Sequence, residues 1–197
     1  MPSGDTVVFE TERLVIRMAT VADVDLFYDL WTNPQVMKNV GFPQGLRITR
    51  SELKQRLQNQ GSESEFERML VIELKVTGQT IGECMMHRPN KKGIAEPDVK
   101  LLPTFWGSKY GVEVWRRLLA YMFTHTDCDA VQATPNVENV ASIKMQEAVG
   151  GVRVGEDEYQ FPESMRDYTT SVHHYIYRVY RMEWEVEQNT SMDGDSI

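Results

Sequence analysis

Residues Leu101–Glu113 have the sequence LLPTFWGSKYGVE, which leads from an apolar strand through a glycine-containing loop into a helix. A helix N-terminus carries unpaired N–H groups and the positive end of the helix dipole, and glycine lets a phosphate come close to the backbone. The stretch is therefore a candidate diphosphate cradle, although similar junctions often only turn the chain. The chain contains neither GxxxxGK[ST] nor GxGxxG here, so a P-loop or a Rossmann dinucleotide site is not supported.

The pattern on both sides of this stretch alternates between strand and helix periods, which predicts a mixed α/β architecture. A proline at position 97 interrupts the strand that precedes the loop, so we expect that strand to be an edge, bulged or splayed there. Strands are predicted at 13–18, 68–76, 79–86, 94–102, 130–134 and 172–184, and helices after Thr20, after Thr49, around 112–122 and over 139–149.

The composition is that of one globular domain, with 197 residues, 41% hydrophobic and 25% charged. We expect a single domain over residues 1–185 and a disordered acidic tail over 186–197. The net charge of −8 argues against nucleic acid and an anionic membrane as partners. No apolar run is long enough to span a bilayer, and the first residues do not have the pattern of an export leader, so we expect a cytoplasmic protein. The two widely spaced cysteines agree with a reducing compartment. The histidines show no metal-ligand spacing, so we expect no metal.

Several segments, taken in order, resemble the GNAT superfamily of N-acetyltransferases in its RimJ/RimL-like branch. That branch opens with TERLxLR, continues with NPxVM, carries PxxWGxGYAxEA before its central helix, and ends with NxxS and RxEW. The matching segments are Glu12-Arg13-Leu14 with Ile16-Arg17, Asp23, Asn33–Met37, Leu101–Glu113, Asn139–Ser142 and Arg181–Trp184. The match runs from about residue 11 to residue 184, nearly the whole chain.

The resemblance implies a GNAT fold, with a central mixed twisted sheet, flanking helices and a V-shaped opening between two splayed parallel strands, here 94–102 and 130–134. It implies acetyl-CoA as co-substrate. Backbone N–H groups of the loop would hold the diphosphate, and Leu101 and Leu102 would meet the pantetheine arm. Asn139 would contact that arm or the 3′-phosphoadenosine. The implied coenzyme-binding residues are Leu101, Leu102, Trp106, Gly107, Ser108, Lys109, Tyr110, Gly111, Val112, Asn139 and Ser142. Lys109 stands where the family has a glycine, so a left-handed backbone there would be strained.

The catalytic groups are predicted less directly. Many GNAT enzymes place a tyrosine seven residues after the motif asparagine, but that position is Gln146 here, so Ser142 is the candidate proton donor to the thiolate. An alternative role for Ser142 is to cap or pack the helix. Glu96 and Asp98 share one strand face by period-2 parity and are candidate bases. A solvated acidic face, Glu83 as the base, and ordered water are the alternatives.

The resemblance implies transfer of an acetyl group to an amine of a small molecule or a protein N-terminus, by a monomer or a homodimer. An aminoglycoside-type acetyltransferase and a catalytically idle CoA-binding module are the alternatives. Residues 155–171 contain five acidic residues against one basic residue, interleaved with Tyr159, Phe161 and Tyr168. This mixture is expected of a wall that receives a cationic amine, although a solvated loop with aromatic anchors explains it as well.

Overall fold

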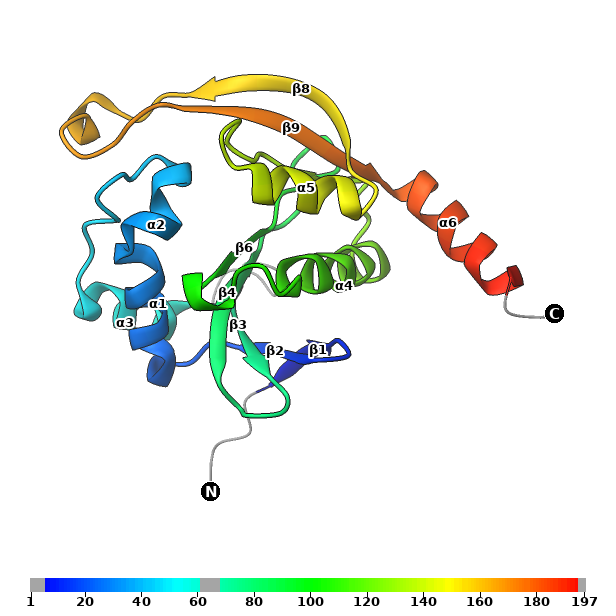
Figure 1. The fold of residues 1–197 in the computed structure, drawn as a ribbon, viewed down its shortest axis with the longest axis horizontal. Helices are drawn as coiled ribbons and strands as arrows, with labels where there is room; N and C mark the ends of the chain where they lie inside the picture. The colour runs from blue at the N-terminus through cyan, green and yellow to red at the C-terminus, as the bar shows by residue number, and fades with distance from the viewer. Residues whose placement is uncertain (1–5, 61–67, 195–197) are drawn as a thin grey trace.

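The computed structural model describes residues 6–60 and 68–194, with side chains described as far as residue 188. Figure 1 shows strands at the centre, with helices on either side and a long hairpin above them. The strands are β1 (Val7–Glu10), β2 (Leu14–Met18), β3 (Arg68–Leu74), β4 (Thr80–Met86), β5 (Ile94–Ala95), β6 (Asp98–Leu101), β7 (Ala130–Ala133), β8 (Val152–Tyr159) and β9 (Val172–Tyr180). The α-helices are α1 (Val24–Thr32), α2 (Pro34–Met37), α3 (Arg50–Asn59), α4 (Tyr110–His125), α5 (Val140–Ala148) and α6 (Arg181–Gly194).

The strands form two sheets that meet at a break in one strand. The first sheet has the antiparallel order β1-β2-β3-β4-β6, and the second has the order β5-β7-β9-β8. In the second sheet β5 pairs parallel to β7, with Ile94 opposite Ala130, while β7, β9 and β8 are antiparallel. The predicted mixed α/β fold is therefore confirmed.

The expected single strand over 94–102 is in fact split into β5 and β6. Pro97 lies between them, and it cannot donate a ladder hydrogen bond. Before the break, Ala95 pairs with Val131 of β7; after it, Asp98 pairs with Met85 of β4. Because β5 belongs to the second sheet and β6 to the first, β6 and β7 diverge, as the prediction of splayed strands required.

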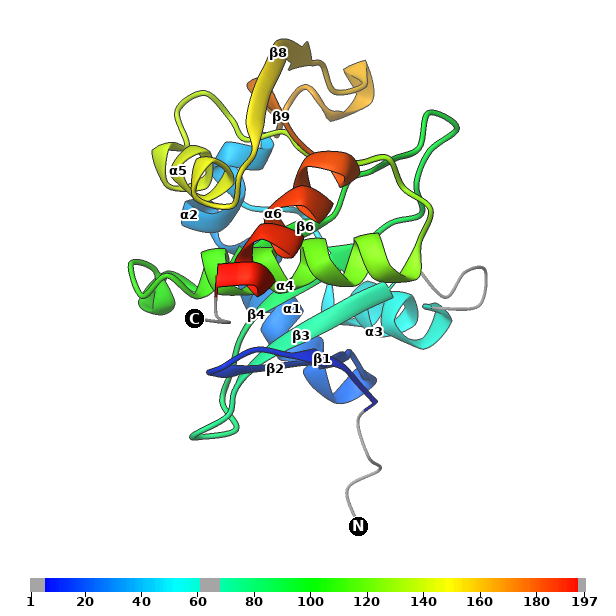
Figure 2. The same cartoon turned by 90° about the vertical axis from the view of Figure 1, so that its right-hand side faces the viewer.

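Two clusters of apolar side chains cover opposite faces of the first sheet. α4 packs on one face, where Leu118 and Met122 join Leu14 and Ile72 from the strands. α1, α2 and α3 cover the other face, where Phe27 and Leu53 join Val71 of β3. Figure 2 shows α4 crossing in front of the strands, with α1 and α3 behind them.

The C-terminal region differs from the sequence expectation in three respects. Residues 152–159, most of them placed in a polar connection by the sequence, form the edge strand β8, paired with β9. The final strand ends at Tyr180 rather than at residue 184, and the chain continues as α6. Helix α6 reaches Gly194, where a disordered tail was expected from residue 186; residues 195–197 lie outside the described part.

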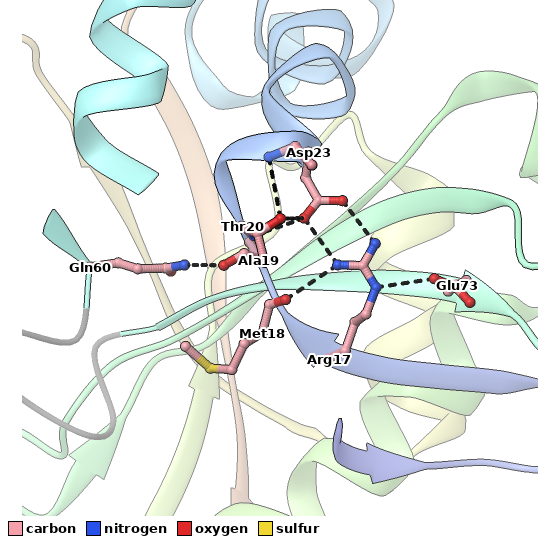
Figure 3. Close-up of polar contacts among 8 residues, drawn as sticks. Arg17, Met18, Ala19, Thr20, Asp23, Gln60 and Glu73 are labelled. Atoms are coloured by element: carbon pink, nitrogen blue, oxygen red, sulfur yellow. Dashed lines mark hydrogen bonds and ion pairs between the residues drawn. The ribbon is translucent and has the colours of Figure 1, made fainter. Parts of the chain in front are cut away.

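Arg17 and Asp23, two residues that carry the family resemblance, form a buried ion pair that joins β2 to the start of the helical layer. The guanidinium donates to both oxygens of Asp23, at 3.0 and 2.8 Å, and to Glu73 of β3 at 3.1 Å, as Figure 3 shows. Burial alone would raise the pKa of Asp23, but hydrogen bonds from Arg17 and Thr20 hold that pKa below its ordinary value. These two motif residues therefore hold the fold together.

Candidate active site

The loop before α4 presents free N–H groups at the end of a long helix. The first helical hydrogen bond runs from Glu113 N–H to the carbonyl of Lys109 at 3.2 Å. The N–H groups of Tyr110, Gly111 and Val112 precede this bond, so they have no acceptor within the helix. Together with the dipole of the 16-residue helix, they form a place suited to a diphosphate.

Lys109 has a left-handed backbone, the conformation that we expected to be strained at this position because the resembling family has a glycine there. Its φ is 62° and its ψ 13°, and within residues 6–60 and 68–194 it is the one non-glycine residue with a positive φ. A left-handed lysine costs about 1 kcal/mol relative to glycine. The loop therefore adopts a left-handed turn at an energetic cost, and it places a positive charge beside the N–H groups of the helix N-terminus.

Glycine is required at positions 107 and 111 of the loop for different structural reasons. Gly107 has φ +80°, and a Cβ there would meet nothing within 4 Å, so its glycine serves backbone conformation. A Cβ on Gly111 would lie 3.0 Å from the sulfur of Met145 in α5. Gly111 thus allows α4 and α5 to pack closely, which is a different role from the close phosphate approach that the sequence suggested.

Trp106 ties the loop to the strand edge that faces the splay. Its indole Nε1 donates to the carbonyl of Leu101 at 2.9 Å, while half of the Trp106 side chain stays exposed. The main-chain groups of Leu102 are engaged within the chain, because its N–H donates to Ile81 of β4 and its carbonyl accepts from Phe105. By strand alternation the main-chain groups of Leu101 point away from β4, and since Trp106 already occupies its carbonyl, Leu101 is placed to offer its N–H to a ligand.

Asn139 and Ser142 lie together at the start of α5. The side-chain oxygen of Asn139 accepts from the backbone N–H of Ser142 at 3.2 Å, which makes Asn139 the N-cap. The cap is thus supplied by Asn139, and the Ser142 hydroxyl forms no hydrogen bond with the described part of the chain. Gln146, which stands at the usual tyrosine position, is buried with 2% exposure.

Glu96 lies in the break between β5 and β6 and reaches toward β7. Its carboxylate accepts from Thr134 Oγ1 at 3.0 Å and from Gln132 Nε2 at 3.5 Å. Asp98 begins β6 and makes its contacts on the side of the first sheet, with Lys100. The two candidate bases therefore flank the apex of the splay, but their carboxylates contact different strands.

A buried charge cluster lies behind Asp98. Glu83 of β4 is fully buried, accepts from Trp31 Nε1 at 2.6 Å, and lies 3.3 Å from the ammonium of Lys100. Burial raises the pKa of Glu83, the charge of Asp98 adds to this, and Lys100 opposes it. Burial would lower the pKa of Lys100, but Asp98 and Glu83 together raise it above its ordinary range. Trp31 and Lys100 were not expected at the site from the sequence. The only signal was the period-2 alternation of the strand, which places Lys100 on the same face as Asp98.

The acidic connection after residue 155 is largely engaged in local contacts. Asp167 pairs with Arg47 at 2.9 Å and Glu156 with Arg153 at 2.7 Å. Phe161 and Tyr168 pack against Phe42, with ring centroids 5.1 and 6.3 Å apart. These contacts anchor the hairpin tip to the helical layer, as the arch above α2 in Figure 1 shows. The aromatic anchors were one of the two alternatives for this segment.

The helices and the potential metal ligands of residues 6–60 and 68–194 bear on two further kinds of site, a membrane span and a metal centre. No helix in these ranges is long and apolar enough to cross a membrane. No group of three or more His, Cys, Asp or Glu residues in them is arranged to hold a metal ion. Cys84 and Cys128 are both buried and unpaired.

Comparison with known proteins gives a consistent family assignment. Residues 13–152 match the family model described as an acetyltransferase (GNAT) domain. The uncharacterized N-acetyltransferase p20 of Bacillus licheniformis is 27% identical over 137 residues, which cover 68% of this chain and 76% of that protein.

Two solved structures share the fold at low sequence identity. The ribosomal-protein-S5-alanine acetyltransferase of Vibrio fischeri has a TM-score of 0.72 at 17% identity and covers 89% of this chain and 97% of its own. The spermidine N-acetyltransferase of Vibrio cholerae, solved with CoA and spermine, has a TM-score of 0.70 at 19% identity and covers 86% and 96%. The family match spans most of the chain, and the splayed strands and α4 loop agree with it: this protein belongs to the GNAT acetyltransferase family.

Proposed function

We propose that the protein transfers an acetyl group from acetyl-CoA to a primary amine by direct attack, with no covalent enzyme intermediate. The observation that carries this proposal is the break at Pro97, which separates β6 from β7 beside the free N–H groups of α4. An extended ligand arm fits an opening with an unpaired strand edge, and its anionic end fits the helix N-terminus. The family supplies the acetyl donor.

The coenzyme would be held by one continuous segment and the start of α5. N–H groups from Gly107 to Val112 would receive the diphosphate, and the ammonium of Lys109 would add charge to it. Leu101 would meet the pantetheine arm through its main chain, on the strand edge that Trp106 fixes. The residues present fit the coenzyme, which supplies an activated thioester for the amine to attack.

Ser142 is the proposed proton donor to the departing thiolate. Its hydroxyl forms no hydrogen bond within the described residues, and Asn139 holds the backbone at that position. Gln146 cannot replace it, because an amide is too weak an acid to donate a proton to a thiolate and this side chain is buried. The free hydroxyl supports a chemical role over the alternative of helix capping, which Asn139 performs.

The acceptor amine would approach the apex of the splay, where Glu96 and Asp98 lie. An ammonium must lose a proton before it can attack, and a carboxylate at the apex is placed to accept one. Both carboxylates already accept hydrogen bonds, Glu96 from Gln132 of β7 and from Thr134 directly after it, and Asp98 from Lys100. We prefer Asp98, because it lies in β6, the strand that borders the splay.

The acceptor class that we favour is a cationic amine. Residues 155–171 are strongly acidic, and the Vibrio cholerae relative is named for spermidine. A protein N-terminus, as in the RimJ/RimL-like branch to which we assign the chain, is the next candidate; the Vibrio fischeri relative is named for a ribosomal protein. An aminoglycoside-type acceptor is a third.

A catalytically idle CoA-binding module is the second candidate function. It is favoured by two departures: the strained lysine in the diphosphate loop and the glutamine at the usual tyrosine position. Both could persist in a domain that binds CoA without turning it over.

The deciding experiment follows thiol release from acetyl-CoA with polyamines, aminoglycosides and N-terminal peptides as acceptors. We expect at least one class to raise thiol release well above hydrolysis, with a Ser142→Ala variant as the matched control. Tight CoA binding without turnover on any acceptor would favour the idle module. Thermal shifts with CoA and acetyl-CoA provide the binding measurement, and no stabilisation by either would exclude both functions.

We also propose a cytoplasmic location. The two cysteines are buried thiols without a disulfide, as is usual in a reducing compartment.

A further inference from the structure

We propose that Glu83 is a neutral carboxylic acid in the folded protein, and that its proton bridges to Asp98 and so fixes Asp98 as a carboxylate at the apex of the splay. Glu83 would be a positioning residue, acting through Asp98. The first half of this inference concerns the protein alone; the second half, the effect on the acceptor, rests on the proposed function.

The contacts of the cluster leave one acceptor atom unused on each acid. Glu83 Oε1 receives the Trp31 indole N–H at 2.6 Å and lies 3.3 Å from Lys100 Nζ, while Asp98 Oδ2 contacts the same Nζ. Glu83 Oε2 and Asp98 Oδ1 are both buried, and neither has a hydrogen-bond partner among the residues that the structure describes. Because one ammonium contacts both carboxyl groups, the two unpartnered oxygens belong to groups held side by side.

A single proton satisfies both unpartnered atoms. A carboxyl proton on Glu83 Oε2 would donate to Asp98 Oδ1, which turns two unmatched acceptors into one hydrogen bond. A buried acceptor without a hydrogen bond is destabilising, so the protonated arrangement is favoured over two bare carboxylates.

The charge balance leads to the same protonation state. Two carboxylates and one ammonium give the cluster a net negative charge, and Glu83 is fully buried. Burial opposes that charge, whereas one added proton makes the cluster neutral. The acid that takes the proton should be the enclosed one, because the side chain of Asp98 is 41% exposed and that of Glu83 is 0% exposed.

Among the described residues, Lys100 is the one cation within ion-pair distance of Glu83. From β6 it faces Lys100 and Asp98, and from α1 it receives only the neutral indole of Trp31. On the β3 side its cross-strand partner is Val71, which is buried and apolar. Lys100 therefore has two acids to neutralise, and one of them must be balanced in another way.

The consequence concerns Asp98, which starts β6 where the two strands part. A hydrogen bond from Glu83 to Oδ1 and the contact from Lys100 to Oδ2 would hold the Asp98 carboxylate in one orientation. An oriented carboxylate at the apex can bind the ammonium group of an acceptor.

Carboxyl 13C NMR of protein labelled at glutamate tests the protonation state without any substrate. We expect one glutamate carboxyl signal at the position of the protonated acid at pH 7, and we expect that signal to vanish in Glu83→Gln. Glu96→Gln is the matched control, because it removes an exposed glutamate from the same apex and should leave the signal in place. If every glutamate in the wild type gives a carboxylate signal at pH 7, the inference is wrong.

Two variants separate the positioning role from a packing role. In Glu83→Gln the amide oxygen can accept from the Trp31 indole and the amide NH2 can donate to Asp98, so this variant imitates the protonated acid. Glu83→Leu fills the same space without a hydrogen-bond donor. We expect Glu83→Gln to keep the acceptor KM within about twofold and Glu83→Leu to raise it about tenfold, with the acetyl-CoA KM unchanged in both.

The opposite order would overturn the positioning role: a loss of acceptor affinity in Glu83→Gln as large as in Glu83→Leu means that a charged Glu83 is required. Thermal melting of both variants identifies a folding defect, and in that case the wild-type NMR titration still decides the protonation state. Failure of the proposed function would appear as inactivity on every acceptor, with the protonated signal still present.

Discussion

Glu113 in the first turn of α4 accepts hydrogen bonds from the backbone N–H of Arg13 at 2.9 Å and from its side-chain Nε at 2.7 Å. These residues are 100 positions apart and belong to the opening motif and the central motif of the family resemblance. The Glu113 carboxylate also accepts from Thr11 Oγ1 at 2.5 Å. The contact therefore attaches the turn between β1 and β2 to the helix that begins at the diphosphate loop.

Loss of this attachment should weaken both the fold and the coenzyme site. We expect Glu113→Gln to lower the free energy of unfolding by about 1 kcal/mol, since the pair is partly exposed and lies at a helix N-terminus. CoA affinity should fall as the loop loses its anchor. Urea unfolding and CoA titration measure the two effects. Glu12→Gln, an exposed neighbour, is the control; equal losses in the two variants would contradict a specific anchor.

Substitutions of Lys109 separate backbone strain from charge. Lys109→Gly should stabilise the protein by about 1 kcal/mol, because glycine adopts the left-handed backbone freely. Lys109→Asn is the second variant, because asparagine tolerates this backbone better than lysine and carries no charge. If the Lys109 ammonium contacts the diphosphate, we expect Lys109→Gly and Lys109→Asn to bind CoA more weakly despite their relaxed backbone. Calorimetric titration with CoA makes the comparison, and unchanged affinity in both would remove Lys109 from the coenzyme site.

The buried pair of Arg17 and Asp23 should make stability depend on pH in the acidic range. The pKa of Asp23 is lowered in the folded protein, so its contribution is present above the unfolded pKa and is lost as the pH falls through the folded pKa. We expect Asp23→Asn to cost about 3 kcal/mol at pH 7. The difference from wild type should shrink below about pH 4. Urea unfolding across pH tests this, and a difference that stays constant with pH would refute it.

Several family motif residues had a structural role that the sequence could not reveal. Arg181 donates to the carbonyls of Phe123, Thr126 and Cys128, so the closing motif caps the C-terminal end of α4. Asn33 caps α2 by accepting from Gln35 at 2.8 Å. Because such contacts connect distant segments or single backbone groups, a motif identifies the residues without showing what they hold.

Local signals predicted most of the fold, and tertiary contacts explain the differences. The helix starts after Thr20 and Thr49 were predicted, and a capping box begins each of them; Pro97 gave a physical reason for the splay. β8 could not be recognised, because its residues are almost all exposed and its pairing with β9 comes from a distant segment. The contacts of Lys100 with Glu83 and Asp98 were missed for a similar reason, because strand register places Glu83 of β4 opposite Lys100 of β6.

Ser142→Ala tests the proposed proton donor. Removal of a general acid should lower kcat about 100-fold while the KM for acetyl-CoA changes little. The helix start should survive, because Asn139 caps the backbone N–H of residue 142 and not the hydroxyl. Steady-state kinetics across pH gives the comparison, and turnover equal to wild type at every pH would exclude Ser142 from the chemistry.

The backbone amide resonances of the α4 loop test the central claim most directly. In a 1H–15N NMR titration with CoA, we predict that the amides from Gly107 to Val112 show the largest shifts, followed by Leu101 on the strand edge. The shifts should saturate at a ratio of one CoA per chain. Saturating CoA that leaves these amides unmoved would contradict the account, because it would show that the N-terminus of α4 does not hold the coenzyme.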